Sequence, residues 1–298
     1  MDQAPGSPQE PQGASGPLGC YRHPDRETGI TCTRCERPIC PECMISASVG
    51  FQCPECVSGG SGTGHAPRAN QPRTIAGGAV AADPRLVTKI LVGLNVVLFL
   101  VQMAVGDRFT DQYDLIGRAF VPDLGSIEGV AEGQYYRLVT AMFLHGSVMH
   151  VVFNMLSLWW IGGPLEAALG RVRYVALYLA SGVAGSALTY LLAEQNRPSL
   201  GASGAVFGLF GATAILMRRL NYDMRPVLAL LAINLLITAF WPNIAWQAHV
   251  GGLVGGLIVG YAMVHAPRER RNLIQYGSCA LVLVVAVVMV VVRTGQLT

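Results

Sequence analysis

Residues 226–267 read PVLALLAINLLITAFWPNIAWQAHVGGLVGGLIVGYAMVHAP and contain no Asp, Glu, Lys or Arg. The strongest break in this run is Trp241-Pro242-Asn243, near its middle. An apolar helix needs about 20 residues to cross the roughly 30 Å hydrocarbon core of a bilayer. The run is therefore long enough for two spanning helices joined near Pro242, and it indicates a polytopic membrane protein.

Similar uncharged runs occupy most of the chain after residue 86. Charged residues make up only 13% of the 298 residues, against roughly 25% in soluble proteins. This composition excludes an ordinary water-soluble enzyme, and a net charge of +3 gives no electrostatic basis for nucleic-acid binding. We expect an all-α polytopic membrane protein. Bounded by fixed charges, the runs predict seven transmembrane helices, over 86–105, 147–165, 173–193, 202–217, 226–240, 245–264 and 273–292.

The arginines predict how these helices are oriented. They follow the second, fourth and sixth expected helices, whereas the loops after the odd-numbered helices carry mainly acids or no charge. Because positive loops stay on the cytoplasmic side, the N-terminus is expected in the cytoplasm and the C-terminus outside. We expect a multi-pass protein of the cell (plasma) membrane.

Composition also divides the chain into domains. Residues 1–19 are Pro, Gly, Ser and Gln with little apolar surface, and we expect them to be disordered. Residues 20–57 hold seven of the eight cysteines, and residues 58–84 have the Gly, Ser and Pro content of a flexible linker. The expected six-helix core spans 85–265. Residues 266–298 supply a seventh helix and a tail.

The cysteine segment has the pattern of a metal-binding module. Its candidate ligands form four pairs, each with two intervening residues: Cys20 with His23, Cys32 with Cys35, Cys40 with Cys43, and Cys53 with Cys56. Eight such ligands suit two tetrahedral zinc ions. Two structural zinc ions would replace the hydrophobic core that so short a segment cannot build.

The sequence does not fix how these pairs combine. An interleaved arrangement, first pair with third and second with fourth, would resemble the B-box and RING group of zinc folds. Disulfides are the alternative, disfavoured because the expected topology puts the segment in a reducing cytoplasm. Four arginines oppose five carboxylates within it, which favours a structural role or a cytoplasmic protein partner over phosphate contacts. Cys279, in the last helix, is expected to be a small apolar residue.

Three polar groups interrupt the apolar helices. The first contains His145, His150 and Asn154, the second is residues 201–204 (Gly-Ala-Ser-Gly), and the third is Ala248-His249. Polar groups inside a membrane are costly and are therefore candidates for function. Because the second, fourth and sixth helices begin on the same side, we expect the three groups at a similar depth.

Glycines would let these groups touch. Gly204 lies on the fourth helix, and Gly252 and Gly256 lie on the sixth, where small faces allow two backbones to approach closely. Such an approach would bring Ser203 Oγ within reach of His249, giving a nucleophile beside a base. The backbone N–H of Ser203, at a helix start, would point at a developing oxyanion.

Residues 86–264 resemble the rhomboid intramembrane serine proteases in the order and spacing of these motifs. The matching motifs are His150-x-x-x-Asn154 with the earlier His145, Gly-Ala-Ser-Gly around Ser203, Ala-His-x-x-Gly-x-x-x-Gly at 248–256, and Glu166 with Arg171. The resemblance implies a six-helix fold around a water-accessible site, a Ser–His dyad without an aspartate, and no catalytic cofactor. It makes Ser203 the nucleophile and His249 the base. It implies oxyanion stabilisation by His150, Asn154 and the Ser203 amide, with structural support from Gly201, Gly204, Gly252, Gly256, Glu166 and Arg171.

Two positions depart from the family pattern. Tyr136-Arg137 replaces a Trp-Arg pair in the first loop, and Phe207 replaces a Tyr below the catalytic His, so stacking is retained without a hydroxyl. By the same resemblance, substrates would be membrane proteins whose transmembrane segments carry helix-breaking residues.

Other functions remain as alternatives. A non-catalytic rhomboid-like scaffold would bind client helices and use the zinc module as an adaptor, although both dyad residues are retained. A transporter is disfavoured because no repeated half with paired broken helices is visible. A metalloprotease is disfavoured because no His-Glu-x-x-His occurs.

Overall fold

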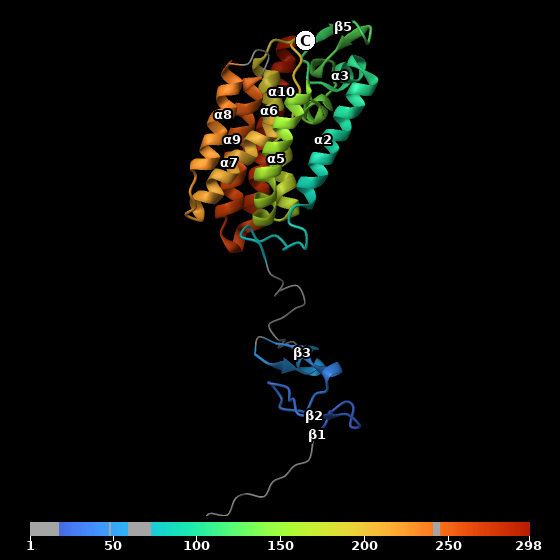
Figure 1. The fold of residues 1–298 in the computed structure, drawn as a ribbon, viewed down its shortest axis with the longest axis vertical. Coiled ribbons are helices and arrows are strands. Elements are labelled where there is room, and N and C mark those ends of the chain that lie inside the picture. Colours follow the sequence, from blue (N-terminus) through green and yellow to red (C-terminus); the bar gives the residue numbers. More distant parts are fainter. Residues whose placement is uncertain (1–17, 48, 59–72, 241–244) are drawn as a thin grey trace, which may run out of the picture. The chain divides into compact units, whose positions relative to one another are not determined.

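The computed structural model of the chain describes residues 18–47, 49–58, 73–240 and 245–298. The chain divides into two units, Met1–Gln71 and Pro72–Thr298 (Figure 1). Most of the segments expected to be disordered or flexible lie outside the described residues, as does the break at Trp241-Pro242-Asn243. Leu18 and Gly19, which we expected at the end of a disordered segment, form a strand instead.

The first unit is built from short elements. Strand β1 (Leu18–Gly19) pairs antiparallel with β2 (Glu27–Thr28), and β3 (Ile45–Ser46) pairs with β4 (Phe51–Gln52). Two single-turn helices, η1 (Pro41–Cys43) and α1 (Pro54–Cys56), complete the unit. Its cluster of buried residues consists of five cysteines and Ile39. So small an apolar core needs covalent or metal cross-links to be stable.

The second unit is mainly helical, and each predicted range contains a helix. These helices are α2 (Leu86–Val105), α5 (Val148–Leu169), α6 (Arg171–Leu192), α7 (Ser203–Arg219), α8 (Arg225–Phe240), α9 (Trp246–His265) and α10 (Arg271–Leu297). Five of them, namely α2, α5, α6, α9 and α10, are long and apolar enough to cross a membrane. Helices α7 and α8 are shorter, at 17 and 16 residues, so seven transmembrane helices remain a prediction.

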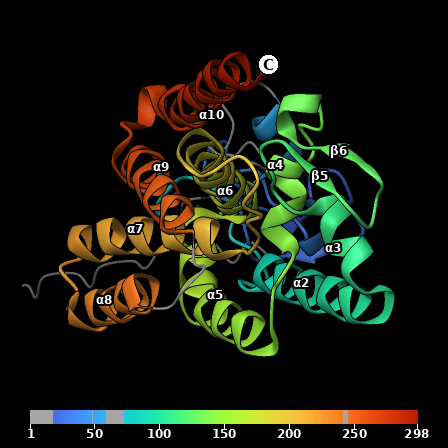
Figure 2. The same cartoon turned by 90° about the horizontal axis from the view of Figure 1, so that it is seen from above.

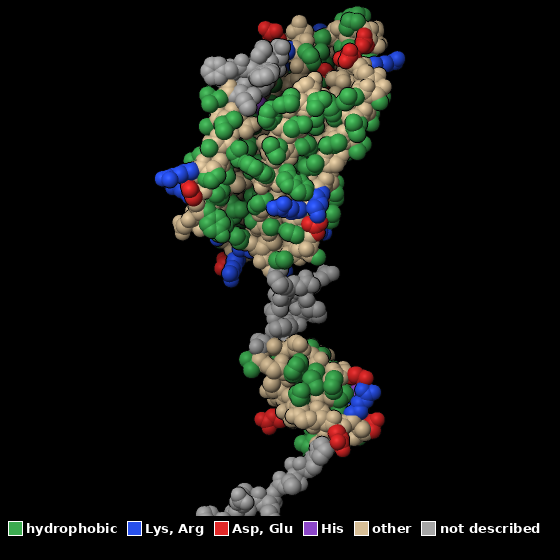
Figure 3. Space-filling view, in the orientation of Figure 1, with side chains coloured by type: hydrophobic (Ala, Val, Ile, Leu, Met, Phe, Trp, Pro, Cys, Tyr) green, Lys and Arg blue, Asp and Glu red, His purple; other side chains and the backbone are tan. Residues whose placement is uncertain are grey.

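Apolar side chains cover the middle of this unit, and charged side chains gather at its two ends (Figure 3). Exposed leucines, valines and tryptophans on α2, α5, α9 and α10 contribute to the apolar surface. Because a soluble protein rarely exposes so much contiguous apolar surface, this surface is expected to face lipid.

Helix α6 is the common packing partner of the unit. Seen from above, it lies inside a ring that includes α5, α7, α9 and α10 (Figure 2). Its buried face is rich in small residues, among them Ala180, Ser181, Gly182 and Gly185. Small residues bring helix backbones close, so that van der Waals contact can hold them together within a lipid environment.

Helices α7 and α9 approach each other most closely through glycines. A Cβ atom on Gly252 would overlap the backbone of Gly204, and one on Gly256 would overlap the backbone of Gly208. The repeat continues at Gly260, which lies against Ala212. No side chain larger than hydrogen fits at the first two contacts, so the glycines set the distance between the two helices.

Glu166 joins α5 to the first turn of α2. Its carboxylate accepts hydrogen bonds from the N–H groups of Val87 (3.0 Å) and Thr88 (2.9 Å) and from the Thr88 hydroxyl (2.9 Å). The first N–H groups of a helix have no partner within the helix. Glu166 therefore supports the fold by accepting from backbone amides of α2. Arg171 donates instead to the backbone oxygen of Asp83, at 3.2 Å.

The loop between α2 and α5 contains structure that hydropathy did not predict. It includes α3 (Asp107–Tyr113), the hairpin β5 (Ala119–Val121) and β6 (Ser126–Glu128), η3 (Val130–Glu132), α4 (Arg137–Thr140) and η4 (Ala141–Phe143). Arg137 is fully buried and pairs with the carboxylates of Asp114 (3.0 Å) and Glu128 (3.3 Å). This buried cation holds the helix, the hairpin and α4 together.

Residues 73–84, which we expected to be part of a flexible linker, make defined contacts with the helices. Ala76 is buried; its N–H donates to Ala168 O (3.3 Å), and its carbonyl accepts from the Gln275 side chain (3.1 Å). The small and Pro-rich composition suggested flexibility. These small residues instead fit closely against the ends of α5 and α10, where backbone hydrogen bonds hold them.

Gly256→Ala tests the contact between α7 and α9. The added methyl group would overlap the Gly208 backbone, and overpacking of this kind costs about 1–3 kcal/mol. We expect a clearly lower thermal unfolding temperature in detergent. The matched control is Gly277→Ala on α10, where the added Cβ would meet no atom within 4 Å other than those of its own stretch of helix. Equal stability of the two variants would contradict the close contact.

Candidate functional site

A cavity of about 490 Å³ opens where α5, α7 and α9 begin. Its lining includes Ser203, His249, His150 and Asn154, the four side chains that the sequence analysis singled out for chemistry. They come from three helices that are distant in the sequence. The expected convergence of the three polar groups on one region is therefore seen in the structure.

Ser203 and His249 form a hydrogen-bonded pair. Ser203 Oγ lies 2.8 Å from His249 Nε2, within the range for a nucleophile and its base. The Phe207 ring stacks on the imidazole, with centroids 4.1 Å apart and planes 7° from parallel. Ser203 is the first residue of α7, and Phe207 lies one turn later on the same face. One helix thus positions both the hydroxyl and the aromatic ring against His249.

A second hydrogen bond holds the other side of the imidazole. His249 Nδ1 lies 2.7 Å from Thr238 Oγ1, and the same hydroxyl donates to Asn234 O at 2.7 Å. Thr238 was missed by the sequence reasoning, because a single Thr in an apolar helix resembles an ordinary back-bonded residue. The detectable signal was its presence with Asn234, one turn earlier, in the otherwise apolar α8.

His150 lies beside the loop that leads into α7. Gly201 has φ +136°, and a Cβ there would come within 2.8 Å of His150 Cε1 and Nε2. Glycine at this position therefore makes room for the imidazole next to Ser203. The Gly146 N–H donates to His150 Nδ1 at 3.3 Å. Asn154, one turn further along α5, lines the cavity while its amide donates to His150 O at 3.0 Å.

His145 is held through its backbone rather than its ring. Its ring is buried, lies edge-on to His150 with centroids 5.0 Å apart, and makes no hydrogen bond within the described residues. Gln102 of α2 accepts from His145 N–H at 2.9 Å and donates to His145 O (3.4 Å) and to Thr110 Oγ1 (3.0 Å). Gln102 was also missed, because its partner lies more than 40 residues away.

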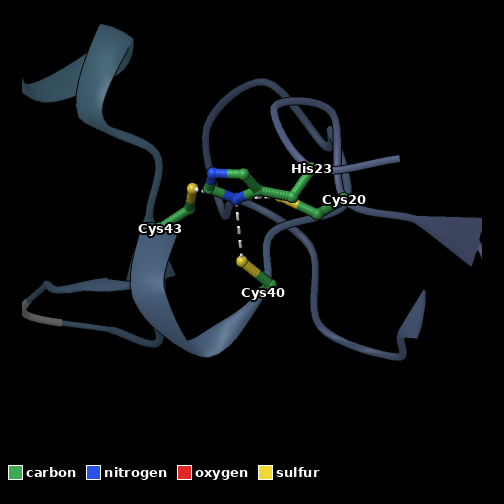
Figure 4. Close-up of side chains that lie close together, drawn as sticks. All are labelled: Cys20, His23, Cys40 and Cys43. Carbon is green, nitrogen blue, oxygen red and sulfur yellow. Dashed lines mark hydrogen bonds between the residues drawn. The ribbon is translucent and has the colours of Figure 1, made fainter. Parts of the chain in front are cut away.

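The first unit brings its ligand pairs together in two clusters. One consists of Cys20, His23, Cys40 and Cys43 (Figure 4), and the other of Cys32, Cys35, Cys53 and Cys56. Within each cluster the ligand atoms lie within 4.8 Å of one another. The first pair thus combines with the third and the second with the fourth, in the interleaved arrangement. Both clusters could hold a metal ion, and Cys279 lies apart from them, buried in α10.

Hydrogen bonds favour the metal-binding thiolate form of Cys20 and Cys35, whereas burial raises the pKa of Cys43 and Cys56. Burial alone would raise the pKa of Cys20, but backbone N–H groups, that of Cys40 foremost, lower it to about 6. The hydrogen bond from the Arg37 side chain, at 3.3 Å, lowers the pKa of Cys35. Three cysteines with one histidine, and four cysteines, are both ligand sets of structural zinc sites, so the donor sets of both clusters fit zinc.

Gln102→Leu tests the hydrogen bonds that hold the His145 backbone. Leucine has a similar size but leaves the buried His145 N–H without its acceptor, which typically costs about 1–3 kcal/mol. We expect lower stability in detergent for this variant. Gln112→Leu, the same exchange at an exposed position of α3, should have little effect. If both variants were as stable as the wild type, the bonds from Gln102 would carry no stabilisation.

Comparison with known proteins gives the family. The model of the Rhomboid domain matches residues 132–266. The chain is 34% identical over 148 residues to "Putative rhomboid protease YdcA" of Bacillus subtilis, covering 48% of this chain and 74% of that protein. It is 36% identical over 155 residues to RHOMBOID-like protein 5 of Arabidopsis thaliana, covering 49% of this chain and 50% of that protein. Rhomboid protease GluP of Bacillus subtilis is 35% identical over 139 residues, covering 45% of this chain but only 27% of its own length. The chain belongs to the rhomboid family, and its apolar helices are those of a multi-pass membrane protein.

Proposed function

We propose that the chain is an intramembrane serine endopeptidase that cleaves transmembrane segments of membrane proteins with a Ser203–His249 dyad. The observation that supports this most directly is the 2.8 Å hydrogen bond between Ser203 Oγ and His249 Nε2 inside the cavity. Family membership alone is insufficient support, because some rhomboid-like proteins are inactive. The retained and correctly paired dyad favours a protease over the non-catalytic scaffold.

In the proposed reaction, His249 acts as general base and then as general acid. Its Nε2 takes the proton of Ser203 as Oγ forms a bond to the substrate carbonyl carbon. The C–N bond then breaks, and the imidazolium gives this proton to the leaving amine. Water, activated by the same Nε2, hydrolyses the acyl ester and frees Ser203.

The negative charge on the substrate oxygen would be stabilised at the start of α7. The Ser203 N–H lies at a helix N-terminus, where backbone donors lack internal partners. His150 Nδ1 accepts from Gly146 N–H, so the proton of the neutral imidazole is on Nε2, beside Gly201. His150 can thus donate toward the same oxygen, and we assign Asn154 the same role.

The chemistry also suggests the kind of substrate. A regular helix in a bilayer keeps its carbonyls hydrogen-bonded within the segment and unavailable to Ser203. A cleavable segment must therefore unwind locally, which favours transmembrane segments with helix-destabilising residues. Such membrane proteins and the bilayer itself are the proposed partners of the helical unit.

For the first unit we propose two structural zinc ions, one bound by the Cys₃His cluster and one by the Cys₄ cluster. Zinc would supply the folding free energy that the small core cannot. The module, residues 20–57, is proposed to bind a cytoplasmic protein. Residues 85–265 form the catalytic core in this proposal, with α10 as an additional helix. The arginine distribution supports a cell-membrane protein with a cytoplasmic N-terminus and an outer C-terminus.

Substitutions at the cavity should separate the catalytic roles. Ser203→Ala and His249→Ala remove the nucleophile and the base, so each should abolish cleavage. Asn154→Ala and His150→Ala remove one oxyanion donor each, which typically lowers the rate by about 10²–10³. The measurement is the initial cleavage rate of a reconstituted transmembrane substrate. Ser278→Ala, a serine of α10 outside the cavity lining, is the control and should cleave normally. Normal cleavage by Ser203→Ala would exclude the serine-protease mechanism and leave the scaffold.

Metal analysis tests the proposal for the first unit. Purified protein should contain about two zinc ions per chain, because each tetrahedral ion takes four ligands. Cys43→Ser and Cys56→Ser should each lower the zinc content and the protease resistance of residues 20–57, whereas Cys279→Ser should change neither. Absence of zinc together with disulfide-bonded cysteines would contradict the zinc assignment.

A further inference from the structure

Thr238 contacts the imidazole of His249 on the side away from Ser203. Its Oγ1 lies 2.7 Å from His249 Nδ1, while Ser203 Oγ lies 2.8 Å from Nε2. Both ring nitrogens of the proposed base therefore have a hydroxyl partner. Ser203 belongs to α7 and Thr238 to α8, so the imidazole of α9 is held between two neighbouring helices.

The number of available protons links the directions of these two bonds. A Thr hydroxyl has one hydrogen, and Thr238 donates it to Asn234 O at 2.7 Å. With the hydrogen on that bond, the contact with His249 is one in which Nδ1–H donates and Oγ1 accepts. A neutral imidazole carries a single N–H. Its Nε2 therefore has a free lone pair, which accepts the Ser203 hydroxyl.

Within the described residues, the Thr238 hydroxyl has two hydrogen-bond partners, Asn234 O and His249 Nδ1. Of these, only the imidazole nitrogen can also donate. The Asn234 side-chain amide is already engaged, donating to Leu230 O at 2.8 Å. Among the described residues that line the cavity, none is an aspartate or glutamate. The orienting contact that serine proteases with a triad obtain from a carboxylate is thus available here from the Thr238 hydroxyl.

We propose that Thr238 is a positioning residue that selects the Nδ1–H tautomer of His249 and accepts from the imidazolium formed when Ser203 is deprotonated. The role rests on the proposed function, since it matters only where His249 is the base. The opposite tautomer would place a proton on Nε2, and His249 could then not take the one from Ser203. The back bond to Asn234 O favours the productive tautomer because it uses the only proton of the hydroxyl.

The hydrogen bond between Thr238 and His249 should contribute moderately to the catalytic rate. The carboxylate of the Ser-His-Asp triad is worth about 10⁴ in kcat because it is charged and holds the tautomer. A neutral hydroxyl holds the tautomer but stabilises the imidazolium less. We therefore expect a contribution of about 10- to 100-fold in kcat, at or below the lower end of the roughly 10²–10⁴-fold that general acid–base catalysis contributes.

Two substitutions at residue 238 separate the hydroxyl from the shape of the side chain. Thr238→Val keeps the branched shape without the hydroxyl, and Thr238→Ser keeps the hydroxyl. We expect Thr238→Val to lose about 10- to 100-fold in kcat with little change in KM, and Thr238→Ser to remain close to the wild type. The matched control is Thr213→Val on α7, where a buried Thr makes the same bond to Leu209 O at 2.7 Å but contacts no histidine. It should leave kcat unchanged.

The tautomer of His249 can be determined by ¹⁵N NMR of histidine-labelled protein. The His249 signals are assigned by their loss in His249→Ala. The wild type should show a protonated Nδ1 and an unprotonated Nε2 at His249, and Thr238→Val should show a mixture. An Nε2–H tautomer in the wild type, an unchanged spectrum in Thr238→Val, or an unchanged kcat in that variant would overturn the proposal.

This measurement does not depend on cleavage. If Ser203→Ala still cleaved substrate, the proposed protease mechanism would fail whatever the NMR result. Conversely, loss of cleavage in Ser203→Ala with an unaltered Thr238→Val would leave the protease intact and remove only the role of Thr238.

Discussion

The closest contacts between α7 and α9 are of backbone against backbone, at Gly204 with Gly252 and at Gly208 with Gly256. Lipid tails are as apolar as the helices, so the hydrophobic effect gives little reason for two spans to associate. The favourable energy of association must therefore come from close van der Waals contact. Because neither helix has a side chain at these contacts, the helices can approach far enough for Ser203 Oγ to reach His249 Nε2 at 2.8 Å. The dyad geometry depends on that approach.

Polar contacts at the ends of helices complement this apolar packing. Glu166 accepts the first N–H groups of α2, Gln102 holds the backbone before α5, and buried Arg137 organises the loop between them. Each joins groups that would otherwise be left unpaired in a low-dielectric environment, where an unsatisfied polar group is expensive. The glycine contacts set the spacing of α7 and α9, and the polar contacts join helix ends and loops that are distant in the sequence.

The helices could be predicted from the sequence because long uncharged runs have few alternative structures in a membrane. The interleaved metal clusters were anticipated as one possibility, although spacing alone left the pairing open. Residues 73–84 were misjudged because composition reports intrinsic flexibility, whereas their order comes from contacts with distant helix ends, such as Ala76 with Gln275. Gln102 and Thr238 were missed for a related reason. The role of a single polar side chain can be assigned only when the fold shows which group it contacts.

As an activated nucleophile, Ser203 should react with a fluorophosphonate, and this reaction can be measured without any knowledge of the substrate. Folded protein in detergent is treated with the reagent, digested and mapped by mass spectrometry. We predict a covalent adduct on Ser203 that is absent in His249→Ala, because only a serine beside a base is nucleophilic enough to react. An unmodified Ser203 in folded wild-type protein, or equal labelling in His249→Ala, would contradict it.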